Sequence, residues 1–152
     1  MQQQKSIYLP VLMLLAAGLT SCAARYRTVR SHGLVADSSP TRLVQVSYEH
    51  ILAALAVTDG CLQRIQGNLP LREVVAKCEA IGKAIRLIDH LNACLDMERG
   101  GAVAVNLRNL YLYMLEQLTI ANATNDRRIV ADVVRLIRTV KTGWDRIVEV
   151  HK

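Results

Sequence analysis

The sequence predicts an all-α protein, an antiparallel up-down-up-down four-helix bundle with an extended N-terminal arm. Apolar residues recur at alternating spacings of three and four in four successive segments, which is the pattern of one helical face. Only short polar or glycine-containing connections separate these segments, and such connections join antiparallel neighbours. No alternating strand pattern competes for the same regions.

The composition indicates one globular domain of 152 residues with a core that must be aliphatic, because Phe is absent. The net charge of +6 is compatible with an anionic partner. Lys and Arg are scattered along the helical segments, however, and the tight group is Arg25, Arg27 and Arg30. This scatter favours solvated helix faces over nucleic-acid binding. A nucleic-acid binder that uses the three arginines is the weaker alternative, and its affinity would fall steeply with salt.

Residues 1–24 form an apolar N-terminal extension that has two interpretations. Lys5 precedes an apolar run from Ile7 to Leu19, which is too short to span a bilayer comfortably. The sequence from Leu19 to Cys22 is similar to the lipobox of bacterial lipoproteins, in which the cysteine is lipidated. One interpretation is therefore an envelope lipoprotein with a helical scaffold role. The other is an apolar extension without processing, or upstream sequence from a misassigned translation start.

Residues 25–38 are basic and then polar, without a clear period. They are expected to form an extended arm whose apolar anchors are Tyr26, Val29 and Leu34. The bundle itself is expected to occupy residues 39–152.

The first helix is expected over about 40–66. Ser39 can serve as its N-cap, and Pro40 suits the first helical position because its missing N–H costs nothing there. Its predicted core stripe is Val44, Tyr48, Ile51, Leu55, Thr58, Leu62 and Ile65.

The second helix is expected over about 71–97, after Pro70. Its predicted stripe is Leu71, Val74, Cys78, Ile81, Ile85, Ile88 and Leu91. On this stripe Cys78 is expected to be a small buried hydrophobe. The adjacent glycines Gly100 and Gly101 are expected to make the turn to the third helix.

The third and fourth helices are expected over about 102–123 and 127–150, with Asp126 as a cap for the last. The third stripe is Val103, Leu107, Leu110, Met114, Leu118 and Ala121. The fourth is Ile129, Val133, Leu136, Val140, Trp144 and Ile147. Trp144 is expected to be largely buried.

These last two helices carry more apolar side chains than one stripe each requires. Residues such as Tyr111, Val130, Val134 and Ile137 are displaced by one position from the predicted stripes. The surplus has two explanations, a wide core or a groove that receives a segment of a partner protein.

The motifs of catalysis and cofactor binding are missing from the sequence. No Glu-x-x-His pair that could hold a di-iron centre occurs, and no phosphate-binding loop, dinucleotide fingerprint or C-x-x-C motif is present. The four histidines lie far apart. We therefore expect a binding protein rather than an enzyme, with no cofactor, no metal and no small-molecule substrate.

Three motifs and one tryptophan resemble a known family. They are S-P-x-x-L-V-x-x-x-Y-E from Ser39 to Glu49, L-D-x-E-x-G-G from Leu95 to Gly101, N-L-x-x-L-Y-x-Y-M from Asn106 to Met114, and Trp144. In this order, over roughly residues 25–150, they are similar to the flagellar secretion chaperone FliS family.

The resemblance implies an all-helical cytoplasmic chaperone without a cofactor. Such a chaperone binds the C-terminal region of flagellin, prevents premature polymerisation and delivers flagellin to the flagellar type III export gate. It also implies that the arm around Tyr26 can fold back over the client groove. The expected flagellin contacts are Leu110, Tyr111, Met114, Val130, Val134 and Ile137.

Overall fold

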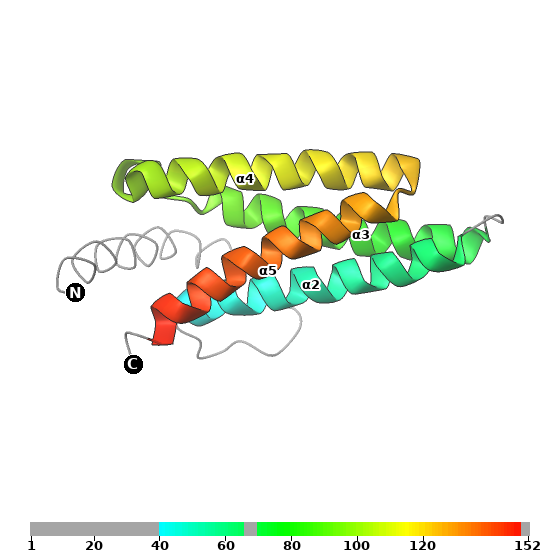
Figure 1. The fold of residues 1–152 in the computed structure, drawn as a ribbon, viewed down its shortest axis with the longest axis horizontal. Coiled ribbons are helices and arrows are strands. Elements are labelled where there is room, and N and C mark those ends of the chain that lie inside the picture. Colours follow the sequence, from blue (N-terminus) through cyan, green and yellow to red (C-terminus); the bar gives the residue numbers. More distant parts are fainter. Residues whose placement is uncertain (1–39, 66–69, 150–152) are drawn as a thin grey trace.

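The computed structural model describes residues 40–65 and 70–149, which form four α-helices (Figure 1). They are α2 (Pro40–Arg64), α3 (Leu71–Ala93), α4 (Met97–Thr124) and α5 (Arg127–Glu149). The described part of the chain contains no strand, and the predicted helical bundle is confirmed. The predicted extension 1–24 and the arm anchors Tyr26, Val29 and Leu34 lie outside the described residues.

The four helices close a ring in which α2 and α4 each contact both α3 and α5. Gln45 Nε2 donates to Asp145 Oδ1 at 2.9 Å near one end of α2, and Arg127 pairs with Asp59 near the other. The start of α2 therefore lies beside the end of α5, and the end of α2 lies beside the start of α5. The two helices are antiparallel. Figure 1 shows α5 beginning beside the end of α4 and slanting towards α2.

The predicted core stripe of α2 is confirmed along its whole length. All seven of its residues, from Val44 to Ile65, are buried. Thr58, the polar member, donates from Oγ1 to the carbonyl of Ala54 at 3.0 Å, so its hydroxyl keeps a hydrogen bond inside the core. One uninterrupted apolar stripe at helical spacing was therefore enough to predict which residues of this helix are buried.

The predicted stripe of α3 is wrong in its first half. Leu71 and Cys78 are exposed, whereas Lys77 is buried. Lys77 Nζ donates to the carbonyl of Asn122 and to Oδ1 of Asn125, each at 2.7 Å, at the end of α4. These two acceptors satisfy the ammonium group, so a residue that the pattern assigns to solvent packs inward and rotates Cys78 outward.

The connection between α3 and α4 comes one turn earlier than the sequence predicts. The helices are separated by residues 94–96, and Asp96 caps α4 by accepting hydrogen bonds from the backbone N–H groups of Glu98 and Arg99. The predicted turn glycines instead form a kink within α4, where Gly101 has φ 51° and ψ −138°. Gly100 is packed so closely that an added Cβ would lie 2.4 Å from Ala104 Cβ.

The tight turn between α4 and α5 is held by backbone and side-chain hydrogen bonds. Asn125 adopts a left-handed conformation, and its N–H donates to the carbonyl of Ala121. Asp126 accepts a hydrogen bond from the N–H of Arg128 at 2.9 Å, which confirms it as the cap of the last helix. Hydrogen bonds from the side chain and the backbone of Arg128 lower the pKa of Asp126.

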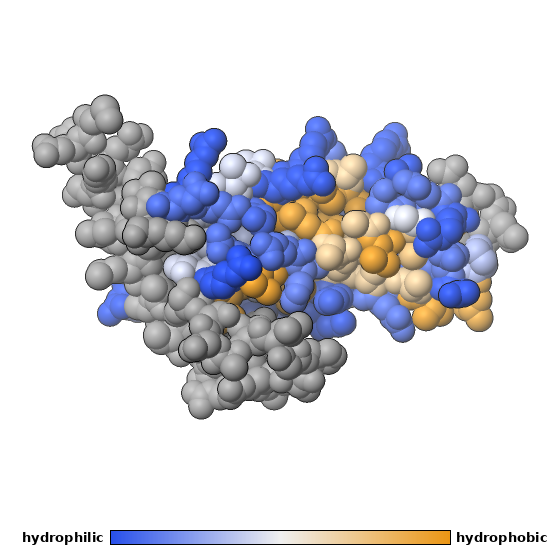
Figure 2. Space-filling view, turned by 90° about the horizontal axis from the view of Figure 1, so that it is seen from below, coloured by the Kyte–Doolittle hydropathy of each residue, from blue (hydrophilic) through white to orange (hydrophobic). Residues whose placement is uncertain are grey.

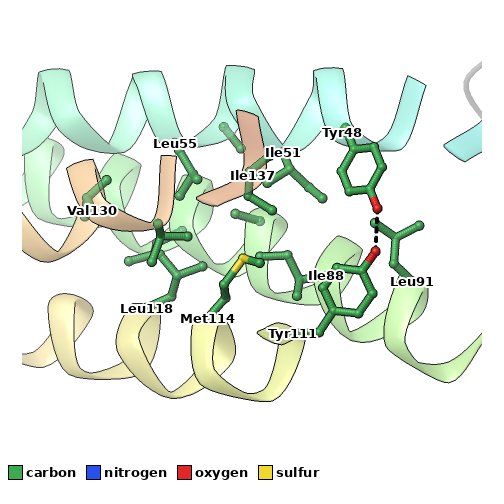
Figure 3. Packing of buried hydrophobic residues seen from close by; sticks show 14 of the residues in the cluster. Tyr48, Ile51, Leu55, Ile88, Leu91, Tyr111, Met114, Leu118, Val130 and Ile137 are labelled. Carbon is green, nitrogen blue, oxygen red and sulfur yellow. Dashed lines mark hydrogen bonds between the residues drawn. The ribbon is translucent and has the colours of Figure 1, made fainter. Parts of the chain in front are cut away.

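The hydroxyl groups of Tyr48 and Tyr111 are hydrogen-bonded to each other in the core (Figure 3). Each tyrosine is 2% exposed. Burial raises the pKa of Tyr48 and raises that of Tyr111 to about 12, so both phenols remain protonated. The pair joins α2 to α4, which lie diagonally across the bundle.

Trp144 anchors the end of α5 to the start of α2. It is 6% exposed, as predicted, and its Nε1 donates to the carbonyl of Thr41 at 3.2 Å. The last turns of α5 therefore have both an apolar and a polar attachment to the bundle.

Replacing one phenol of the tyrosine pair should cost more per hydroxyl than replacing both. Tyr48→Phe leaves the Tyr111 hydroxyl buried without this partner, and the expected loss of unfolding free energy is about 1–3 kcal/mol. Removing both hydroxyls leaves no buried polar group to satisfy, so the double Phe variant should lose less than the sum of the two single variants. Urea denaturation of the four proteins measures the cycle, and strict additivity would contradict a direct bond.

Trp144→Ala should destabilise the bundle by about 3–5 kcal/mol, because it leaves a large cavity. Trp144→Phe serves as the comparison, since it keeps an aromatic ring and removes the indole N–H. Urea denaturation should rank the two variants in this order. A loss below about 1 kcal/mol for Trp144→Ala would show that the indole is not part of the core.

Candidate protein-binding surface

The six residues that the sequence favoured as partner contacts fall into two groups. Tyr111, Met114, Val130 and Ile137 are buried in the core cluster, with at most 2% of each exposed (Figure 3). Leu110 and Val134 are half-buried beside that cluster. Of the four residues predicted to be displaced from the core stripes, Tyr111, Val130 and Ile137 are instead buried. Met114, a predicted stripe residue, is buried as that stripe requires, so it is not available as a surface contact.

The predicted core stripes of α4 and α5 are confirmed in part. Met114, Leu118 and Ala121 of α4 and Val133 and Trp144 of α5 are buried as predicted, but the core faces of both helices are rotated towards residues outside the predicted stripes. The core face of α4 consists of Ala104, Tyr111, Met114, Leu118 and Ala121. On α5 the buried side chains are Val130, Val133, Ile137 and Trp144. The predicted core residues Leu107, Leu136 and Val140 are only half-buried. The side chain of Ile147 lies outside the described part.

Hydrogen bonds to the other helices identify which sides of α4 and α5 face each other. Asn122 marks the α3 side of α4, because it contacts Lys77 and Cys78. At about 100° per residue, Leu110 lies roughly 120° around the helix from Asn122. Asp145 marks the α2 side of α5, and Leu136 lies roughly half a turn from it. Leu110 and Leu136 therefore lie on the facing sides of their helices.

We call this surface the α4–α5 seam. Its half-buried apolar residues are Leu107, Leu110, Ile129, Leu136 and Val140. Its exposed rim on α4 is Val103, Tyr113 and Ile120, which are 43%, 47% and 39% exposed. Figure 1 shows that α5 slants away from α4 along its length. The side chains of the seam are partly exposed, and those of the rim more so.

Residues 40–65 and 70–149 contain no group of three or more His, Cys, Asp or Glu side chains that could hold a metal ion. The carboxylates with lowered pKa are engaged in ion pairs; at Asp59, for example, the hydrogen bond from Arg127 is the main cause. None of the four described helices is long and apolar enough to cross a bilayer.

The described residues thus form a small all-helical bundle with an apolar seam between α4 and α5. Comparison with known proteins identifies the family. The model of the family "Flagellar protein FliS" matches residues 22–151. This match and the relatives described next show that the chain belongs to the FliS family of flagellar secretion chaperones, which are not enzymes.

Three relatives from different bacteria are similar over most of their length. The flagellar secretion chaperone FliSB of Pseudomonas aeruginosa is 39% identical over 123 residues, covering 81% of this chain and 92% of the relative. The FliS chaperones of Vibrio cholerae and Salmonella typhimurium are 37% and 36% identical. Each of these two covers 80% of this chain, with 85% and 86% of the relatives matched.

Ile137→Glu should unfold or strongly destabilise the bundle, because it places a carboxylate among buried aliphatic side chains. The neighbouring Arg138→Glu, at an exposed position, is the control and should change the unfolding free energy by about 0.5 kcal/mol or less. Circular dichroism during thermal unfolding checks both. A stable Ile137→Glu variant would contradict the burial of this residue and would place it on the protein surface.

Proposed function

We propose that this chain is a cytoplasmic flagellar export chaperone. It binds the C-terminal region of flagellin, prevents its premature polymerisation and delivers it to the export gate of the flagellar type III apparatus. Membership of the FliS family supports this function, and the α4–α5 seam offers a surface suited to it. The rival function, an envelope lipoprotein, depends on the apolar run from Ile7 to Leu19 and on lipidation of Cys22.

The observation that carries the proposal is the apolar seam itself. Its half-buried aliphatic side chains lie on the facing sides of α4 and α5, and its exposed rim lies beside them on α4. Each aliphatic side chain that a client buries fully is worth roughly 1.5–3 kcal/mol. Several together can offset the conformational entropy that an unfolded client loses on binding.

The spacing of the rim favours a helical client segment. Val103 and Leu110 are seven residues apart and form one row on α4, because side chains two turns apart lie above one another. Tyr113 and Ile120 form a second, adjacent row, roughly 80° farther around the helix. An amphipathic helix that presents apolar residues at positions i, i+3, i+4 and i+7 would match such a row. Together the two rows extend about 25 Å along α4, enough for roughly 17 helical residues.

The six residues that the sequence predicted as flagellin contacts have different roles in this proposal, according to where each lies in the bundle. We assign Leu110 a direct contact with flagellin, because it lies in the seam. Val134 lies only about 20° around α5 from Asp145, on the side that faces α2. We therefore assign it at most a minor contact with flagellin. Tyr111, Met114, Val130 and Ile137 support the seam from within the core, where they set the positions of α4 and α5.

The client site can be tested with a pair of neighbouring residues on α4. Leu112 and Tyr113 are both 47% exposed, but only Tyr113 lies on the rim of the seam. Tyr113→Glu should reduce flagellin co-purification from flagellated cells by roughly tenfold or more, whereas Leu112→Glu should leave it near the wild-type level. Both variants should keep the wild-type melting temperature, because neither replaces a core residue.

The outcomes separate the function from the site. If wild-type protein does not co-purify flagellin, the proposed function is wrong. If wild-type and Tyr113→Glu bind flagellin equally, the function stands and the seam is not the site.

A further inference from the structure

Exposed arginines border the α4–α5 seam on its α5 side. Arg128, Arg135 and Arg146 lie in one row on α5, because their separations of seven and eleven residues are close to whole helical turns. We call this row the arginine edge. It lies about 80–100° around α5 from Leu136, a residue of the seam. Although Arg128 and Arg135 each form an ion pair, their side chains remain 90% and 77% exposed, so both are accessible to a partner.

The guanidinium group of Arg135 is turned towards the seam. It is hydrogen-bonded to the carboxylate of Asp132. Asp132 lies one turn before Leu136 and about 40° around the helix from it. A guanidinium group carries five N–H donors, and one carboxylate accepts at most a bidentate pair of them. Arg135 can therefore bind a second carboxylate beside Asp132.

The opposite border of the seam, on α4, is uncharged. Asn106 and Gln117 lie within about 40° of Leu110, the central seam residue of this helix. From residue 102 to its end, α4 contains two charged residues, Arg108 and Glu116. They lie about 160° and 120° around the helix from Leu110, on other sides of α4. The seam thus has a basic border on α5 and a neutral border on α4.

This difference in charge is more specific than a difference in hydropathy. On the face of the bundle that is seen from below, hydrophilic side chains border an apolar area both above and below it (Figure 2). A hydrophilic border limits the size of an apolar area. A border that is charged on one side can also distinguish the two flanks of a bound helix.

We propose that the arginine edge selects a client helix with carboxylates along one flank and sets the direction in which this helix lies in the seam. The inference rests on the proposed use of the seam as the client site. A helix whose apolar face covers Leu110 and Leu136 turns one flank towards α5 and the other towards α4. Carboxylates on the first flank meet Arg128 and Arg135, with which they form charge-assisted hydrogen bonds.

The asymmetry of the two borders determines the direction of the bound helix. Reversing the helix exchanges its flanks, so its carboxylates then lie against the neutral border of α4 and lose the arginines. Arg128 and Arg135 are about 10 Å apart along α5. Two carboxylates that are seven residues apart on a client helix aligned with α5 match this distance.

A nucleic acid is the other anionic partner that exposed arginines can bind. Its affinity arises mainly from its phosphates, so it would leave the aliphatic side chains of the seam uncovered. A helix with an apolar face and one acidic flank matches both the seam and the arginine edge. It is therefore the favoured occupant.

Two synthetic peptides of about 18 residues test the selection. Both carry the same apolar face at positions i, i+3, i+4 and i+7, and they differ in having Glu or the isosteric Gln along one flank. Fluorescence anisotropy with the full-length protein at low salt measures the two dissociation constants. We expect the Glu peptide to bind roughly three- to tenfold more tightly than the Gln peptide, and added salt to reduce this ratio.

Variants at exposed arginines locate the preference. The double variant Arg128→Gln with Arg135→Gln should bring the ratio close to one and keep the wild-type melting temperature. The control Arg86→Gln with Arg138→Gln removes the same charge from exposed positions on α3 and on the α2 side of α5, and it should keep the ratio. Leu110→Ala should weaken both peptides by a similar factor, because both cover this residue.

Several results would overturn the proposal. They are equal affinities of the two peptides for the wild-type protein, no measurable binding of either peptide, and no effect of Leu110→Ala. A ratio that falls equally in the control variant would assign the preference to the net charge of the chain. Displacement of the Glu peptide by a single strand of about 20 nucleotides, but not in the variant of Arg128 and Arg135, would assign the arginine edge to nucleic acid.

Flagellin co-purification is scored separately from the peptides. A wild-type protein that co-purifies flagellin but binds both peptides equally would keep the proposed function and exclude the charge selection. A wild-type protein that prefers the Glu peptide but does not co-purify flagellin would keep the charge selection for another client.

Discussion

The hydrogen bond between the Tyr48 and Tyr111 hydroxyls sets the arrangement on which the rest of the bundle depends. It connects the two helices that lie diagonally opposite, and both phenols are buried where water cannot replace a lost partner. With Tyr111 held inward, the rotation of α4 is determined. Met114 and Leu118 then follow it into the core, and Leu107 and Leu110 are left at the side that faces α5.

This rotation of α4 explains which buried residues the sequence predicted correctly and which it did not. On α2 a single stripe carries nearly all of the large apolar side chains that this helix buries, and the burial of all seven stripe residues was predicted. On α4 and α5 two apolar stripes lie side by side, about 100° apart. Periodicity alone does not distinguish them, and the choice is made by contacts with partners far away in the sequence, such as Tyr48.

The other differences have local causes of the same kind. The burial of Lys77 depends on two oxygen acceptors some 45 and 48 residues away, which no local pattern shows. The break near Gly100 and Gly101 was recognised, but Asp96 provides a cap one turn earlier, so the chain re-enters a helix before the glycines. The candidate partner surface also differs from the predicted one. Where a residue expected at the surface is buried, its neighbour on the adjacent stripe is more exposed than expected.

The kink in α4 has a consequence for the sequences that this fold tolerates. Position 100 excludes a methyl group because Ala104 occupies the space, and position 101 disfavours side chains because its backbone has a positive φ. The two glycines are thus required for unrelated reasons, one steric and one conformational. Neither can compensate for loss of the other, so even alanine, the smallest change, is unfavourable at both positions of this corner.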